Sequence, residues 1–177
     1  IISIIAGKKI RELKKITKNK NSTVRAMTNT PVSLGMGTSI IYFDKGIKRQ
    51  SKNLAKEFLA LVGQVNEAKN ESAIDSFTAI YGSGPAYIYL MIESLIKISS
   101  KAGHKNSENM VIQTFLGSLL LLMSGNSSAK TLRENVTSKG GTTQAALSIL
   151  NSHNGLPKLL SRAINKAKKR SIELSSN

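Results

Sequence analysis

VIQTFLGSLLLLM, residues 111–123, decides the architecture of the C-terminal half of this 177-residue chain. The stretch is apolar almost all round a helix that the sequence predicts to begin at Asn106 or Ser107, so we expect burial on every side. A segment of roughly a hundred residues has too little core of its own to bury such a helix. The sequence therefore predicts an obligate dimer through this half, in which a second copy supplies the contacts. The alternative is a helix buried at the centre of its own small bundle.

The residues around this stretch follow a helical period as well. Upstream, a long helix is predicted after GSGP at residues 82–85, with Ser83 as its N-cap, Pro85 in its first turn and Gly103 at its end. Downstream, a short helix is predicted after residue 143, and a last helix is predicted to end at about Glu173. The helical period begins near Asp75, which predicts a domain boundary at residues 69–73.

The N-terminal part alternates strands and helices instead. A β-branched run at residues 1–6, closed by Gly7, is typical of a strand buried on both faces of a parallel sheet. A lysine-rich amphipathic helix follows it. Further strands are predicted at 23–27 and 38–43, a helix at 53–62 and a short edge strand at 64–67. This alternation predicts an α/β sheet.

Charge suggests one class of partner, which other features of the composition disfavour. The chain has 26 lysines and arginines against 10 acidic residues, and Lys158, Arg162, Lys166 and Arg170 recur every four residues along the last predicted helix. Such a stripe suits nucleic acid. However, aromatic residues make up only 5% of the chain, and no basic segment is interleaved with stacking side chains. We therefore expect a solvated lysine-rich surface and no nucleic-acid partner.

A few residue types indicate the cellular compartment of the protein and whether it binds a metal. The chain has no cysteine, which excludes disulfides and fits a reducing compartment. Its longest apolar stretch, at residues 115–123, is far too short to span a bilayer. We expect a soluble, cytoplasmic protein with no membrane partner. His104 and His153 have no second ligand at a suitable spacing, so they are predicted to be surface residues and no metal site is expected.

The loop TSKGGTT, residues 137–143, is the candidate ligand site. Free backbone N–H groups at a helix start bind anions. Thr142 and Thr143 are predicted to cap the helix that follows, while Gly140 and Gly141 let the backbone approach a small ligand closely. The loop therefore predicts a carboxylate or phosphate cradle. The alternative is an ordinary capped turn.

Three motifs in fixed order carry a family resemblance: RAMTNTP at 25–31, GSGPAY at 82–87 and TSKGGTT at 137–143. Together they closely resemble the pyrroline-5-carboxylate reductases, over essentially the whole chain. The resemblance implies an α/β plus all-α fold. Residues 1–70 would be the C-terminal part of a Rossmann-type NAD(P)-binding domain, and residues 71–177 a helical domain for dimerisation and substrate binding. It also implies a homodimer, or a higher oligomer of such dimers.

The resemblance further implies reduction of 1-pyrroline-5-carboxylate to L-proline by hydride transfer from NADPH or NADH, the last step of proline biosynthesis, without a metal. The backbone N–H groups of Gly140, Gly141 and Thr142 would hold the substrate carboxylate. Thr143, as the catalytic residue, would place its hydroxyl near the ring nitrogen, and Ser138 would shape the loop.

On the cofactor side, the resemblance assigns Ala6 and Gly7, at the end of the first strand, and the turn Asn29, Thr30 and Pro31 to the nicotinamide end. The alternative for this turn is a plain end to a strand. We expect Gly82 and Gly84 to permit close packing at a helix start.

The largest departure from the family is that no Gly-x-Gly-x-x-Gly motif follows a strand, since Gly35-Met36-Gly37 lacks the third glycine and precedes a predicted strand. We therefore expect weak binding of NAD(P)H by this chain alone, which would be a fragment or the product of a degraded gene. The alternative function is a catalytically inactive remnant that acts only as a dimerising helical module. Lys139 replaces the usual proline, so we expect a solvent-facing lysine and looser substrate binding.

Overall fold

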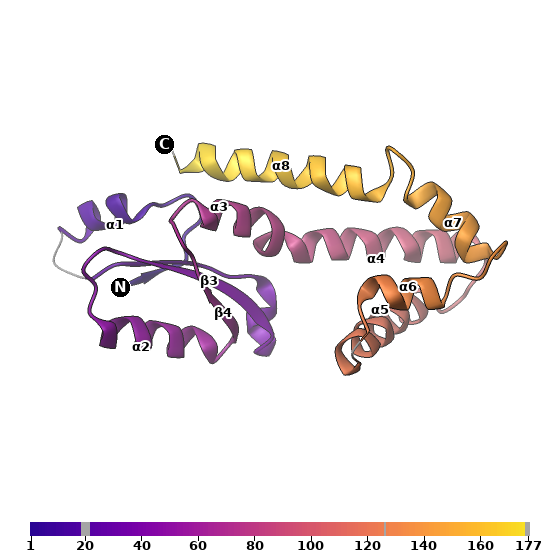
Figure 1. Cartoon of the computed structure of the whole chain (residues 1–177), viewed down its shortest axis with the longest axis horizontal. Helices are drawn as coiled ribbons and strands as arrows, with labels where there is room; N and C mark the ends of the chain where they lie inside the picture. The colour runs from indigo at the N-terminus through magenta and orange to yellow at the C-terminus, as the bar shows by residue number, and fades with distance from the viewer. Residues whose placement is uncertain (19–21, 126, 176–177) are drawn as a thin grey trace. The chain divides into compact units, whose positions relative to one another are not determined.

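The computed structural model describes residues 1–18, 22–125 and 127–175 (Figure 1). They form two compact units. The sheet unit comprises Ile1–Tyr87 with Arg162–Asn177, and the helical unit comprises Ile88–Ser161. The predicted division at residue 70 follows the change in sequence pattern and stays a prediction, because the sheet unit includes helices from the C-terminal side of that position.

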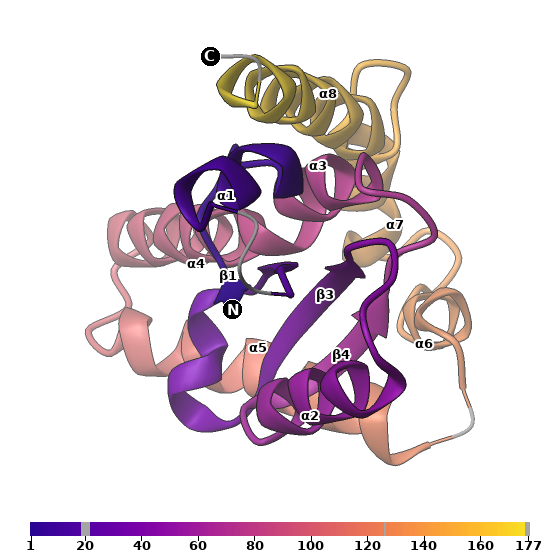
Figure 2. The ribbon, with the colours of Figure 1, turned by 90° about the vertical axis from the view of Figure 1, so that its left-hand side faces the viewer.

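The sheet unit is built on four strands in sequence order (Figure 2). The strands are β1 (Ile2–Ser3), β2 (Val24–Met27), β3 (Gly37–Phe43) and β4 (Gly63–Glu67). β1 pairs with β2 and β3 with β4 in parallel, whereas β2 and β3 are antiparallel. The strands predicted at 23–27, 38–43 and 64–67 are confirmed to within one residue, and β4 lies at the edge as expected. The sheet is mixed rather than parallel.

The first strand is shorter and more exposed than predicted. β1 covers two residues instead of six, and Ile1, Ile4 and Ile5 are each more than half exposed. The prediction of a strand buried on both faces is wrong. β1 is an edge strand of the described sheet, so one side of it has no neighbouring strand to bury these isoleucines.

Alternating residues of β3 place a core on each face of the sheet. Ile41 and Phe43 pack with Ala55 and Leu59 on one face, and Ile40 packs in a second cluster on the other. Helix α2 (Arg49–Ala60) covers the first face, and α3 (Ala73–Phe77) covers the second. The period of two in the sequence therefore produces a helix–sheet–helix sandwich.

Three further α-helices contribute to the sheet unit, and two of them extend beyond it. The lysine-rich helix is α1 (Ile10–Ile16). After α3, a π-helical turn, η2 (Thr78–Gly82), leads into α4 (Gly84–Lys101), whose start and end match the prediction. Ser83 is not its N-cap, because its backbone is already helical (φ −86°, ψ −12°). The last helix, α8 (Leu156–Leu174), lies in the sheet unit from residue 162 onward.

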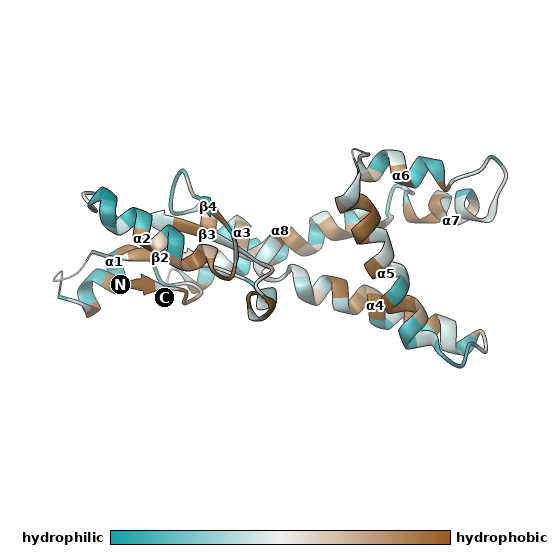
Figure 3. Ribbon diagram, turned by 90° about the horizontal axis from the view of Figure 1, so that it is seen from below, coloured by the Kyte–Doolittle hydropathy of each residue, from teal (hydrophilic) through white to brown (hydrophobic). Residues whose placement is uncertain are grey.

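The helical unit contains α5 (Ser107–Ser124), α6 (Ala129–Asn135) and α7 (Thr142–Leu150). Among its described residues no apolar side chain is buried, and Figure 3 colours much of α5 as hydrophobic. The alternative of α5 buried within its own bundle is therefore wrong. No single helix in the described ranges is long and apolar enough to cross a membrane. Taken together, α5 and α6 are long and apolar enough, but a bend of 119° separates them.

Candidate functional site

The turn after β2 is braced by the side chain of Asn29. Its Oδ1 accepts a hydrogen bond from the Thr38 N–H at 2.9 Å, and its Nδ2 donates to the Tyr81 carbonyl at 3.3 Å. The 3-10 helix η1 (Thr30–Leu34) begins directly after it, with Pro31 in its first turn. Both ends of the Asn29 amide are engaged, so this side chain holds the turn between β3 and η2. The carbonyls of Asn29, Thr30 and Pro31 also accept hydrogen bonds within the chain, so the exposed side chain of Thr30 is what remains for a ligand.

Gly7 lies where only glycine fits. β1 and β2 are parallel, so Ala6 and Gly7 follow the same sheet edge as the turn at Asn29, the edge at which α/β sheets bind ligands. Gly7 has φ +77°, and a Cβ added to it would lie 2.8 Å from the Leu174 carbonyl oxygen. Close packing against α8 therefore accounts for this glycine, and its cofactor role stays a prediction.

The π-helical turn η2 carries the Tyr81 carbonyl that Asn29 binds, and two further hydrogen bonds connect it to the residues that follow. The Ser83 N–H donates to the Thr78 carbonyl at 2.8 Å, and the Tyr87 hydroxyl donates to the Ala79 carbonyl at 2.9 Å. Single π-turns are common at functional sites. The adjacent glycines are not required by packing within the chain, because an added Cβ would meet only ordinary contacts at Gly82 and none within 4 Å at Gly84. Packing within the described chain therefore does not explain these two glycines.

The loop at 137–143 forms a tight entry to α7. Gly140 has φ +74°, and its N–H donates to Gln144 Oε1 at 2.5 Å. The Gly141 N–H donates to the Ser138 carbonyl at 3.1 Å. Gly141 is the N-cap of α7, and no side chain caps the helix. The prediction that Thr142 and Thr143 are caps is therefore wrong, because they are the first two residues of the helix.

Of the three backbone N–H groups predicted to bind the carboxylate, the structure leaves that of Thr142 free among the described residues. Gly140 and Gly141 already donate within the chain, whereas the N–H groups of Thr142 and Thr143 have no acceptor in the described part of the chain. Two free N–H groups at the start of a nine-residue helix suit a carboxylate. The sequence reasoning missed Gln144, which could have been found from the preference for glutamine three residues after an N-cap.

Charged groups contribute little to either part of the site. Lys139 is exposed and forms no ion pair with any described residue, as expected for a solvent-facing lysine. His104 and His153 are exposed, and no three His, Cys, Asp or Glu side chains gather as a metal site in the described ranges. The two shifted carboxyl groups lie elsewhere: the Lys9 N–H lowers the pKa of Glu12, and a Lys97 hydrogen bond lowers that of Glu93.

The predicted site residues fall into two groups. Ala6, Gly7 and the turn 29–31 follow neighbouring strands of the sheet unit, and the residues from Ser138 to Thr143 form one loop of the helical unit. The roles of these residues stay predictions.

Comparisons with known proteins agree on one family. Residues 71–174 match the family model described as pyrroline-5-carboxylate reductase dimerisation. Pyrroline-5-carboxylate reductase 1 of Bacillus subtilis is 35% identical over 100% of this chain and 60% of its own length, and the Vibrio alginolyticus reductase is 36% identical over 98% and 65%. The Plasmodium falciparum reductase, solved with NADP bound, superposes with a TM-score of 0.89 at 32% identity, covering 99% of this chain and 71% of that one. The chain thus spans less than two thirds of the two bacterial relatives.

Proposed function

The chain belongs to the pyrroline-5-carboxylate reductase family, and we propose that it supplies the substrate-binding part of an enzyme that reduces 1-pyrroline-5-carboxylate to L-proline with NADPH or NADH. This would be the final step of proline biosynthesis. The observation that carries the proposal is the pair of free N–H groups at Thr142 and Thr143, on a loop that retains the family motif. Residues 1–70 would belong to the cofactor domain and 71–177 to the dimerisation domain.

In this proposal the loop binds and orients the substrate. The N–H groups of Thr142 and Thr143 hold the carboxylate, and that of Gly140 joins them when Gln144 releases it. The Thr143 hydroxyl hydrogen-bonds the ring nitrogen and keeps the imine polarised. No nucleophile is needed, because the imine carbon only has to be held where it can accept hydride.

The cofactor, when bound, supplies the hydride. Ala6, Gly7, Asn29, Thr30 and Pro31 would hold its nicotinamide end. Their place after the parallel strands β1 and β2 fits that role, since ligands bind at the carboxyl ends of such strands. The chain has no glycine motif for the pyrophosphate, so its own residues fit one end of the cofactor only. The proposal needs no metal and involves no nucleic acid or membrane.

We further propose that the functional form is a homodimer, or a higher oligomer of dimers, located in the cytoplasm. The described part of the helical unit buries no apolar side chain, so the free energy that would hold it together as a monomer is missing. On α5, Ile112, Leu116, Leu120 and Met123 follow one another at spacings of three or four residues. A second copy covering this stripe would supply the missing core.

A second candidate function is a catalytically inactive dimerising module. The engaged N–H groups of Gly140 and Gly141 favour it. It keeps the helical interface and loses the chemistry.

Oxidation of NADPH and NADH with pyrroline-5-carboxylate tests the two candidates. The assay should be run on this chain and on the chain extended by any coding sequence that precedes it. For whichever is active, Thr143→Val removes the hydroxyl but keeps the shape, and we expect a loss of at least about tenfold in kcat, in line with a positioned proton donor. Thr17→Val, at the residue that follows α1, is the matched control. Inactivity of both chains, with a folded dimer in solution, would establish the dimerising module instead.

A further inference from the structure

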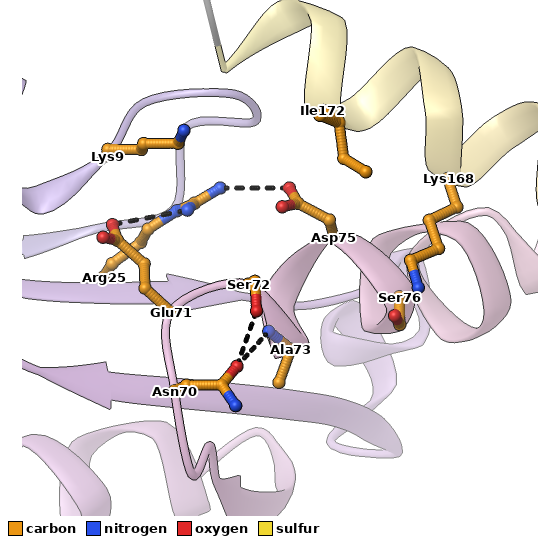
Figure 4. Close-up of a pocket in the computed structure, with 10 residues that line it drawn as sticks. All are labelled: Lys9, Arg25, Asn70, Glu71, Ser72, Ala73, Asp75, Ser76, Lys168 and Ile172. Atoms are coloured by element: carbon orange, nitrogen blue, oxygen red, sulfur yellow. Dashed lines mark hydrogen bonds and ion pairs between the residues drawn. The ribbon is translucent and has the colours of Figure 1, made fainter.

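Arg25 is a charged residue in the middle of a buried strand. It lies on β2, whose four residues are all buried, and its side chain is only 1% exposed. A buried guanidinium is costly unless neighbouring charges compensate it. Figure 4 shows its surroundings, in which the side chains of Glu71 and Asp75 approach it from two sides.

Each of these carboxylates also binds a donor from a third element. Arg25 Nη1 lies 3.4 Å from Glu71 Oε1, and Nη2 lies 3.7 Å from Asp75 Oδ1. Glu71 Oε1 accepts the Ile10 N–H at the start of α1 at 2.7 Å, and Asp75 Oδ1 accepts the buried Ser171 hydroxyl of α8 at 2.9 Å. One guanidinium therefore connects β2 with α1, α3 and α8.

The guanidinium is arranged for these charges rather than for a ligand. Its Nε and Nη2 have no hydrogen-bond partner among the described residues and are closed to solvent. A cavity of about 670 Å³ borders the group, with Lys9, Ser72, Ser76 and Lys168 among its lining residues. Because water-sized solutes do not reach Nε or Nη2, a molecule in this cavity would not bind them.

The end of α8 is fastened to the sheet unit at the same place. The Leu174 carbonyl packs on Gly7, and the buried Ser175 hydroxyl donates to the Ser171 carbonyl at 3.0 Å within the end of α8 itself. The chain leaves the sheet unit along α4, which continues from α3 and η2, and it returns along α8. Asp75 and Ser171 therefore bond the outgoing and returning segments to each other, beside Arg25.

We propose that Arg25 is a positioning residue: through Asp75 and Glu71 it holds the start of α3 and the end of α8 against strand β2, four residues before the turn at Asn29. It touches neither substrate nor cofactor and acts on the site through these helices. The inference rests on the proposed function for its catalytic consequence. Its structural consequence can be measured without any activity.

Hydrogen exchange on the full chain tests the structural part. The variants are Arg25→Met and Arg25→Lys, with Arg170→Met as control, because Arg170 is exposed on α8 and pairs only with Glu173 among the described residues. Arg25→Met should speed exchange in residues 168–175 and in α3 by at least about tenfold, since breaking a buried pair leaves its carboxylates uncompensated. β3 should change much less. Arg25→Lys should show the same pattern more weakly, because one ammonium cannot span two carboxylates on different elements. The control should match the parent chain.

Two exchange results would overturn the inference. Equal acceleration in β3 and in residues 168–175 would mean that Arg25 only contributes to core stability. Full protection in Arg25→Lys would mean that any cation suffices at this position.

A kinetic readout separates positioning from loss of folded enzyme. In whichever chain is active, partial unfolding lowers kcat at constant KM, whereas displaced helices should raise KM in Arg25→Lys. An unchanged KM would contradict the catalytic consequence. If no chain is active, the proposed function fails while the exchange experiment still decides the role of Arg25.

Discussion

Leu120→Ala should weaken self-association through the helical unit. Leu120 lies on the apolar stripe of α5, and it is 55% exposed in the single chain. Full burial of a leucine side chain is worth about 2 to 3 kcal/mol, so a partner that covers the exposed part contributes about 1 to 1.5 kcal/mol. Truncation to alanine removes about 1 kcal/mol of this in each protomer.

Symmetry doubles the effect. In a twofold interface both copies lose the contact, so the dimer should lose about 2 kcal/mol, which corresponds to roughly a thirtyfold higher Kd. Sedimentation equilibrium over a range of concentrations measures this Kd directly. The midpoint of thermal unfolding should also rise with protein concentration in the parent chain.

Leu54→Ala is the matched control, because Leu54 is 67% exposed on α2 of the sheet unit and lies outside the proposed interface. We expect its Kd to equal that of the parent chain. A folded monomer at all concentrations, or a Kd that responds to Leu54→Ala and not to Leu120→Ala, would refute the interface through α5.

Gly7→Ala should destabilise the chain by about 2 to 5 kcal/mol and Gly46→Ala by only about 1 to 2, in urea denaturation, because both have positive φ but only Gly7 packs against another backbone; equal losses would contradict the packing argument. Lys139→Pro should tighten binding of L-proline two- to fivefold in calorimetry by restricting the free loop, and unchanged affinity would count against the looser loop. Glu12→Gln should lower the free energy of unfolding near neutral pH. The hydrogen bond from the Lys9 N–H lowers the folded-state pKa of Glu12 below its usual 4.5. The stability that the ionised Glu12 adds is therefore present above pH 4.5 and is lost as the pH falls through the lowered pKa. If the parent chain and Glu12→Gln still differed in their free energy of unfolding below the lowered pKa, the ionised Glu12 would not be the source of the difference.

Local patterns predicted most elements, and they failed where a neighbour was needed. The period of two along β3 and the helical period of α4 and α5 each depend on residues within one element, so their positions were predicted closely. The run of isoleucines at residues 1–5 predicts a buried strand, and this local pattern is the same whether or not the strand has neighbours in the sheet. Only pairing in the sheet shows that it ends at Ser3.

The candidate site divides in the same way. The motifs identify the turn at Asn29 and the loop before Thr142, because motif residues are contiguous. The hydrogen bond from Asn29 to Tyr81 spans 52 positions, and no local signal announces it. The position of Gln144 in the helix could have identified it as a capping residue. That its side chain accepts the Gly140 N–H could not be predicted from the sequence.

The sequence by itself determined the order of helices and strands, the family and the loop that is proposed to bind substrate. These properties depend on backbone periodicity and on short motifs, which neighbouring residues carry. Tertiary structure alone decided that Gly7 must accommodate Leu174, that Arg25 meets Glu71 across 46 positions, and that Ser171 meets Asp75 across 96. A buried charge or hydroxyl gains its stability from whichever segments the fold brings beside it, and that pairing is a property of packing rather than of local sequence.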